Sequence, residues 1–199
     1  MNLELKRTPE PRASRIFILL CVAGCGAGSH PAPAPPCDQG CQDGVALLGA
    51  RTMMKLAYNT VVQGQNVGPQ DGTTPCLPSG STHGSVHVFG TATVNAVQGS
   101  SFVMLSYDFQ NCLYSSPPDP MADQNFSVTL TGLVTEQGTL AVQPSSTTAL
   151  AIQSDSLSLT GTVYDPPVDY AASDCVLAVN QNGNAVAGTF CDRAAGFTF

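Results

Sequence analysis

Apolar and polar residues alternate from Ser85 to Phe190, and this alternation constrains the fold more than any other feature of the sequence. Side chains that alternate with a period of two are typical of β-strands with one buried face. Turn-forming sequences such as Glu136-Gln137-Gly138 separate several of the alternating segments. The apolar positions fall within 86–94, 103–109, 126–134, 140–142, 150–152, 157–163, 177–179 and 186–190. We therefore expect a mainly β fold, an antiparallel meander of about eight strands.

Glycine recurs inside four of these segments, at Gly90, Gly132, Gly161 and Gly188. Because glycine destabilises the interior of a strand, its recurrence indicates bends or bulges that curl the sheet. The alternative is chance recurrence in a sequence rich in small residues. Bends of this kind predict a half-barrel or an open barrel, whose concave face has room for an apolar molecule.

One segment, 43–62, has the periodicity of an α-helix. Its apolar residues recur three or four positions apart, while Arg51 and Lys55 fall on the other side of the helix. Asp43 is expected at the N-terminus of the helix, where a carboxylate accepts hydrogen bonds from free backbone amides. This helix is the expected cover for part of the apolar face of the sheet.

The first 24 residues have the organisation of an export signal. Basic residues precede the apolar run 16–23, which is much shorter than the roughly 20 residues needed to cross a bilayer. The run ends in Val22-Ala23-Gly24-Cys25, which resembles the lipobox of bacterial lipoproteins. The resemblance implies cleavage before Cys25 and acylation of that cysteine, so that two or more lipid chains anchor the protein in a membrane. The alternative is an ordinary secretory signal cleaved after Ala23 or Ala27.

The remainder of the chain divides into a tether and a domain. Residues 25–36 comprise Cys25 and a Pro-rich segment that has too few apolar residues to form a core, so we expect an extended tether. Residues 37–199 are expected to form a single disulfide-bonded β domain. Gly26 stands where an aspartate signals inner-membrane retention in enteric lipoproteins. The resemblance therefore implies the outer membrane of a Gram-negative bacterium, with the domain in the periplasm or at the cell surface.

The chain after Cys25 is strongly acidic. Its basic residues are Arg51, Lys55 and Arg193, against twelve Asp and Glu. Binding to nucleic acid or to anionic lipid headgroups requires clustered Lys and Arg to neutralise phosphates. Three basic residues cannot form such a cluster, which excludes nucleic acid as a partner.

Six cysteines follow Cys25, an even number that indicates three disulfides in an oxidising compartment. The hairpin sequence Asn182-Gly183 lies between Cys175 and Cys191, and a three-residue loop there would bring the two cysteines opposite each other. Cys76 is expected to hold the polar stretch 63–84 as a long loop. The expected pairs are Cys175 with Cys191, Cys76 with Cys112, and Cys37 with Cys41. Because the last pair lacks the haem-attachment spacing, no cofactor is expected.

The sequence has no recognisable set of catalytic residues, so an enzyme is not expected. Three functional hypotheses follow. The preferred one is a non-catalytic envelope lipoprotein with a structural or protein-interaction β domain, which predicts a filled core. The second is a carrier or sensor of an apolar ligand, which predicts a sizeable apolar cavity between the helix and a curled sheet. The third is a hydrolase that uses His83 or loop aspartates. His83 and His87 have the spacing of two metal ligands, but no third ligand is evident, so no metal site is expected.

Overall fold

The structure is a computed structural model that describes residues 37–63, 68–76, 83–95, 97–116, 124–144, 146–164 and 166–199. The chain divides into two units, 1–35 and 36–199, and all described residues belong to the second. The signal peptide, Cys25 and the tether lie outside the described residues. The predictions made for them therefore stay predictions.

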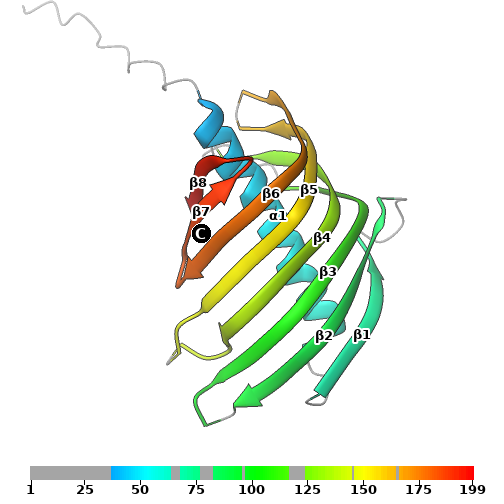
Figure 1. Cartoon of the computed structure of the whole chain (residues 1–199), viewed down its shortest axis with the longest axis vertical. Helices are drawn as coiled ribbons and strands as arrows, with labels where there is room; N and C mark the ends of the chain where they lie inside the picture. Colours follow the sequence, from blue (N-terminus) through cyan, green and yellow to red (C-terminus); the bar gives the residue numbers. More distant parts are fainter. Residues whose placement is uncertain are drawn as a thin grey trace, which may run out of the picture. The chain divides into compact units, whose positions relative to one another are not determined.

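The described part of the chain forms one eight-stranded antiparallel sheet in sequential order (Figure 1). Each strand pairs with the next one along the chain, and the sheet is not closed, so that β1 and β8 are its edges. The expected meander is confirmed. The strands are β1 Gly68–Pro75, β2 Ser85–Asn95, β3 Ser100–Ser115, β4 Phe126–Ala141, β5 Ala149–Val163, β6 Val168–Asn182, β7 Ala185–Phe190 and β8 Arg193–Thr198.

Several strands differ from the predicted segments. β1 lies within the stretch 63–84 that was expected to be a loop, because an edge strand tolerates Pro and Gly and pairs on one side only. The predicted turn at Glu136 is wrong, since the strand β4 runs without interruption from 126 through 136 to 141 and so joins two of the predicted segments. In the same way, 150–152 and 157–163 form the single strand β5, and β8 adds a strand at the C-terminal edge.

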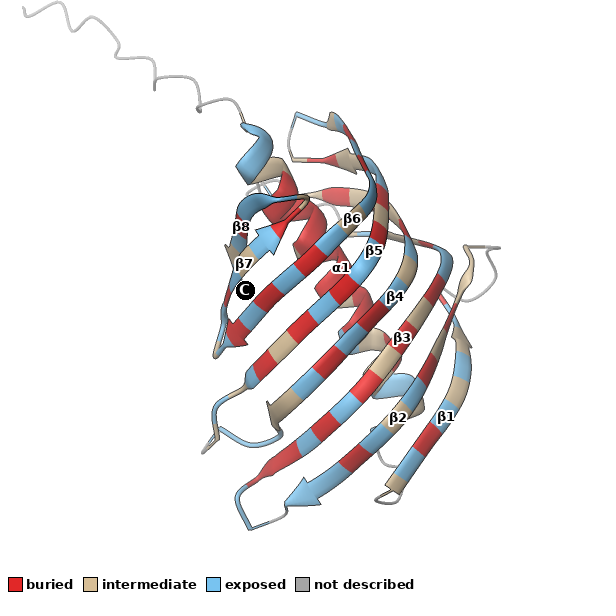
Figure 2. Cartoon of the chain, viewed as in Figure 1, coloured by how far each residue is buried: buried red, intermediate tan, exposed pale blue. Residues whose placement is uncertain are grey.

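Burial alternates along the strands, as the sequence pattern predicts (Figure 2). On β3, for example, Val103, Leu105 and Tyr107 are buried, whereas the alternate residues Phe102 and Met104 are exposed. The buried face is concave and holds the helix α1, Gln39–Val61. The core therefore lies between one curled sheet and one helix.

The helix begins four residues earlier than expected, and its N-cap is Asp38, whose side chain accepts a hydrogen bond from the amide of Cys41 at 2.9 Å. The prediction that Asp43 lies at the helix N-terminus is wrong. Asp43 is inside the helix and fully buried, because polar groups from other elements bind its carboxylate.

Of the four recurring strand glycines, Gly132 lies at a register shift, whereas Gly90, Gly161 and Gly188 pair in continuous register. The strand β4 changes register against β5 between Gly132 and Thr135, and Gly132 has a φ of +128°. A Cβ on Gly132 would lie 2.4 Å from the carbonyl oxygen of Ser156 on β5, so no larger residue fits there. The bulge expected at this glycine is confirmed.

The three disulfides of the described domain join Cys37 to Cys41, Cys76 to Cys112 and Cys175 to Cys191, the pairs expected from spacing. The three-residue loop predicted between β6 and β7 is wrong, because Asn182 pairs with Ala185 and leaves a two-residue turn. Cys191 instead lies beyond the end of β7, with a φ of +51°. Cys175 on β6 pairs with Leu157 on β5, and the register between these strands shifts on both sides of that pair. Cys175 forms its disulfide with Cys191 from this irregular part of the sheet.

Candidate functional site

Arg51 lies on the buried side of α1, so its predicted position on the exposed face is wrong. Its side chain is 4% exposed, and its Nη2 lies 3.1 Å from Oε1 of Glu136 on β4. Its Nε donates a hydrogen bond of 2.8 Å to Oε1 of Gln181 on β6. A guanidinium is found in a protein interior when it is paired, and these two partners on the sheet turn Arg51 inward.

Glu136 connects this arginine to the sheet. The hydroxyl of Tyr107 on β3 donates a 2.6 Å hydrogen bond to Oε2 of Glu136. Burial and the adjacent carboxylate raise the pKa of Tyr107 well above its ordinary value, so the phenol keeps its proton and donates. Oε1 of Glu136 has no hydrogen bond among the described residues, and Arg51 stabilises it as an ion pair.

A cavity of about 410 Å³ lies beside Arg51, between the second half of α1 and one end of the sheet. Its volume is within the range of small-molecule sites, roughly 300 to 1,000 Å³. Exposed residues of α1, of β2 and of the β6–β7 turn form its rim. The buried residues that form its inner wall are Arg51, Val62, Gln70, Ala92, Ser101 and Gln181.

The helix–sheet interface is well filled on both sides of this cavity. One small void lies between α1 and the Cys76–Cys112 disulfide, and another lies around Met54 and Ile152. Each measures about 20 Å³, which is enough for roughly one water molecule. A more open hollow of about 390 Å³ adjoins the cavity and shares Ala141, Thr148, Gly183 and Asn184 with it, so space for a larger molecule lies at this end of the sheet.

Lys55 lies at the rim of the cavity, one helical turn after Arg51. Its Nζ is 5.3 Å from the centroid of the Phe199 ring, a distance at which a cation is attracted to an aromatic face. The backbone amide of Phe199 donates to the carbonyl of Asn184 at 3.0 Å, which fixes the ring against the β6–β7 turn. None of the described residues that line the cavity is an Asp or a Glu.

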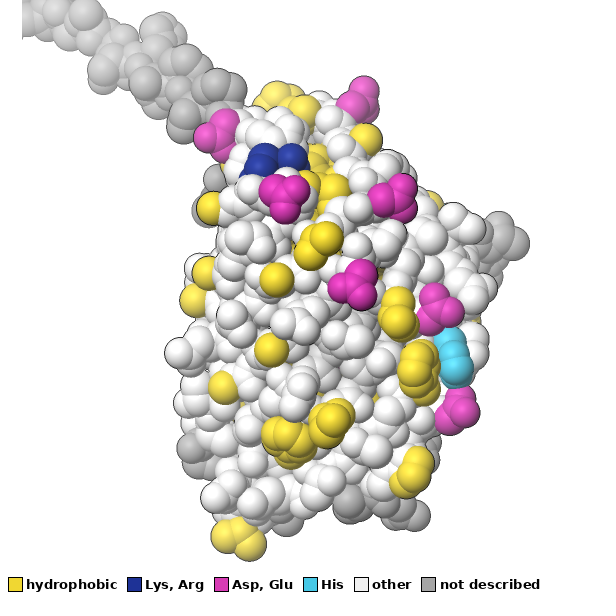
Figure 3. Space-filling view, in the orientation of Figure 1, with side chains coloured by type: hydrophobic (Ala, Val, Ile, Leu, Met, Phe, Trp, Pro, Cys, Tyr) yellow, Lys and Arg dark blue, Asp and Glu magenta, His cyan; other side chains and the backbone are white. Residues whose placement is uncertain are grey.

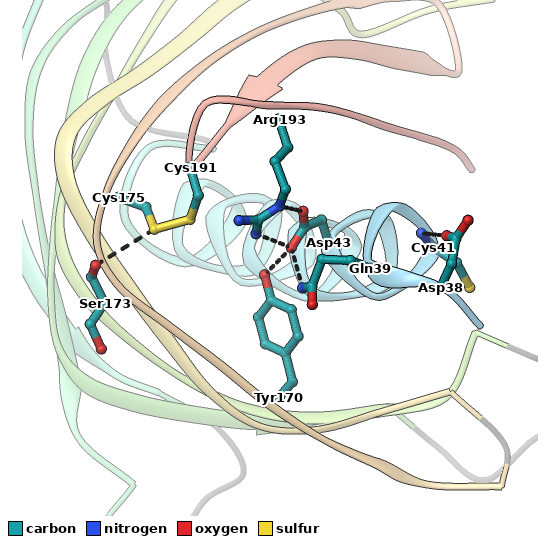
Figure 4. A network of polar contacts seen from close by, with 9 residues as sticks. All are labelled: Asp38, Gln39, Cys41, Asp43, Tyr170, Ser173, Cys175, Cys191 and Arg193. Atoms are coloured by element: carbon teal, nitrogen blue, oxygen red, sulfur yellow. Dashed lines mark hydrogen bonds and ion pairs between the residues drawn. A yellow bond between two sulfur atoms is a disulfide. The ribbon is translucent and has the colours of Figure 1, made fainter. Parts of the chain in front are cut away.

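A second buried polar cluster surrounds Asp43 near the start of α1 (Figure 4). Nε and Nη2 of Arg193 on β8 lie 2.8 and 2.9 Å from the two carboxylate oxygens of Asp43. The Tyr170 hydroxyl and the Gln39 amide donate to Oδ1 at 2.7 and 3.1 Å. This cluster ties the helix to β6 and β8, and its residues do not line the cavity. We therefore assign it a structural role.

The same hydrogen bonds set the ionisation of the cluster. Burial opposes the charge on Asp43, but the hydrogen bonds from Arg193, Tyr170 and Gln39 outweigh it and lower the pKa of this carboxyl. Burial and the carboxylate raise the pKa of Tyr170, which stays protonated. The hydrogen bond to Asp43 also raises the pKa of Arg193.

His83 and His87 are not among the residues that line the cavity. Nε2 of His87 on β2 is 2.7 Å from Oδ1 of Asp71 on β1, and both side chains face solvent. His83 precedes β2, and its carbonyl accepts a hydrogen bond from the Leu113 amide. The serines nearest before His83 in the sequence, Ser79 and Ser81, lie outside the described residues, so the hydrolase hypothesis stays a prediction. In the described ranges, His, Cys, Asp and Glu form no group of three that is placed to hold a metal.

The sequence did not predict the buried polar residues around the cavity, because their positions in the chain indicated exposed or turn locations. The helical period placed Arg51 on the solvent side, and Glu136 was placed in a turn. A signal was nevertheless present: Glu136 is the one glutamate after the proposed cleavage site, and it lies inside an alternating β pattern. A lone acid in such a pattern indicates a buried carboxylate with a basic partner.

Among the described residues, no helix is both long enough and apolar enough to span a membrane. Comparisons with protein-family models, with curated proteins and with solved structures found no match to this chain. The functional argument therefore rests on the cavity itself.

Proposed function

We propose that this chain is a lipid-anchored protein of a Gram-negative outer membrane, and that its β domain carries or senses a small apolar molecule. The cavity of about 410 Å³ between α1 and the curled sheet supports this proposal. A purely structural or protein-interaction domain was expected to have a filled core, so the cavity favours the carrier hypothesis over it.

Export and anchoring are supported by separate features. The sequence Val22-Ala23-Gly24-Cys25 resembles a lipobox, and the Pro-rich segment that follows is suited to be a spacer. Three disulfides in one small domain fit an oxidising compartment outside the cytoplasm. Mass spectrometry of the protein extracted from its own envelope tests the anchor, with a diacylglyceryl group expected on Cys25.

Binding is tested with the mature chain 26–199, exported without its lipid so that the disulfides form. Native mass spectrometry is expected to detect a retained small molecule, and titration with the neutral probe N-phenyl-1-naphthylamine is expected to give saturable fluorescence. Ala92 faces the cavity from β2, and Phe at this position would fill part of it. We expect Ala92→Phe to weaken probe binding about tenfold or more, which corresponds to a loss of about 1.4 kcal/mol.

The matched control is Thr91→Phe, which adds the same ring to the exposed face of the same strand. This variant should bind the probe as the unmodified chain does. Circular dichroism and thermal unfolding establish that both variants are folded. A chain that fails to bind the probe, or equal binding by the two folded variants, would leave the structural hypothesis in place.

A further inference from the structure

We infer that the cavity selects an amphiphile with a single negative charge, specifically a fatty carboxylate, and that Lys55 binds its head group. The inference rests on the proposed function, because it names the class of molecule that the same cavity takes. It is carried by the distribution of charge around the cavity.

Basic side chains are concentrated at the cavity of an otherwise acidic domain. Two of the three basic residues after Cys25, Arg51 and Lys55, line it, while none of the twelve acidic residues is among its described lining residues. The outer face of the sheet has scattered acidic side chains, and basic ones only near β7 and β8 (Figure 3). An anion is therefore repelled by much of the domain surface and attracted to this cavity.

The ion pairs determine how much charge the cavity offers. Glu136 neutralises Arg51 from behind the inner wall, and Gln181 occupies the Nε of the same guanidinium. The ion pairs among the described residues have Arg51, His87 and Arg193 as their basic partners. Lys55 takes part in none of these ion pairs. Lys55 is thus the basic lining side chain whose charge has no acidic side chain paired with it, and one such cation matches a monoanion better than a phosphate with two charges.

Lys55 lies towards one end of the cavity, and several apolar lining residues lie towards the other end, where Gln63 and Gln70 also line it. Lys55, Gln181 and Phe199 lie on the side of β6–β8, which are the last strands of the sheet order. Val62, Ala92 and Val94 lie on the side of β1 and β2, at the opposite edge. Lys55 and Val62 are about 10 Å apart along the helix axis, at 1.5 Å per residue. A carboxylate at Lys55 thus places its alkyl chain against the apolar residues.

Competition against the neutral probe tests this inference on the mature chain 26–199 at pH 8, where a carboxylate is ionised. The competitors are dodecanoate, dodecanol, dodecyltrimethylammonium and dodecyl phosphate, which share one chain length and differ in head group. We expect dodecanoate to displace the probe at about a tenfold lower concentration than each of the others. Added NaCl should reduce this preference, because the rim is exposed to solvent.

Two variants of Lys55 assign the preference to this residue. Lys55→Gln removes the charge and should bring dodecanoate to the level of dodecanol, with both competitors compared against that variant's own measured affinity for the neutral probe. Lys55→Arg keeps the charge and should keep the preference. Because Lys55 is exposed and outside the ion pairs of the core, neither change should unfold the domain.

The outcomes separate the inference from the proposed function. If dodecanol competes as well as dodecanoate, the cavity binds apolar molecules without recognising a carboxylate, and the inference is wrong. If the preference persists in Lys55→Gln, Lys55 does not bind the head group. Absence of probe binding by the unmodified chain contradicts the proposed function itself.

Discussion

At the scale of single residues, Asp43 shows how partners determine the state of a buried carboxylate. Its ordinary pKa of 3.8 is lowered in the folded protein. On acidification, the unfolded chain therefore takes up the proton first. The stability that Asp43 contributes is present above about pH 4 and is lost as the pH falls through its folded pKa. We expect Asp43→Asn to lower the free energy of unfolding by about 2 kcal/mol at pH 7.

Urea unfolding at pH 7 and at pH 3 measures this difference. The Asn variant should lose less stability between the two pH values than the unmodified chain, because it lacks the titrating group. Asp71→Asn is the control, since Asp71 is 81% exposed beside His87 and such pairs contribute about 0 to 1 kcal/mol. An unchanged pH dependence in Asp43→Asn would show that another group dominates acid unfolding.

Single residues were also where sequence reasoning was least informative. The helical period placed Arg51 outward and Asp43 at a cap, which are reasonable positions for charged residues met in isolation. The partners that bury them are far along the chain: Gln181 lies 130 residues after Arg51, and Arg193 lies 150 residues after Asp43. A local pattern does not contain this information.

At the scale of elements, small residues of α1 allow it to lie against the sheet. A Cβ on Gly44 would lie 2.7 Å from the carbonyl oxygen of Gly196 on β8. Because that oxygen belongs to the backbone, the strand or the helix must shift to admit a methyl group. We expect Gly44→Ala to lower the free energy of unfolding by about 1 to 3 kcal/mol, as overpacking does.

Gly40→Ala is the matched control on the same helix. Its Cβ would meet one atom, the Asp38 carboxylate oxygen at 3.5 Å, which is an ordinary contact. Since alanine favours the helix over glycine, this variant should gain about 0.5 kcal/mol. Thermal and urea unfolding compare the two. A stabilised Gly44→Ala would mean that the helix does not approach β8 as closely as the structure has it.

Strands with a buried face were predictable, and strands without one were not. Alternation located β2, β3, β6 and β7, because half of their residues are apolar and face α1. The eight residues of β1 include two Gly and two Pro, and only Gln70 is buried, so no period of two is visible. In β4, polar Glu136 and Gly138 interrupt the apolar pattern although the backbone pairing continues.

At the scale of the whole domain, the helix buries the apolar concave face of the curled sheet, and the sheet buries the apolar face of the helix. The sheet curves around α1, and the helix contacts both edge strands, β1 and β8, so that it covers the concave face from edge to edge (Figure 4). The apolar alternation predicted this face and its cover. The cavity was not predictable, because it depends on where the helix ends relative to the sheet.

The disulfides stabilise this arrangement to different extents. Their cysteines are separated by 36 residues for Cys76–Cys112, by 16 for Cys175–Cys191 and by 4 for Cys37–Cys41. A longer closed loop removes more conformational entropy from the unfolded chain, by about 4, 3 and 2 kcal/mol for loops of these lengths. Only the first pair joins the end of β1, an edge strand that pairs with a single neighbouring strand, to the end of β3.

We therefore expect paired Cys→Ala variants to lose stability in that order, with the removal of Cys76 and Cys112 the most damaging. Thermal unfolding of the three variants, each lacking one disulfide, measures the order. Alanine is the appropriate replacement because Cys76 and Cys112 are buried, and a serine hydroxyl there would add a polar desolvation cost. If the loss of Cys37–Cys41 proved the largest, the first turn of α1 rather than edge strand β1 would be the point at which the domain begins to unfold.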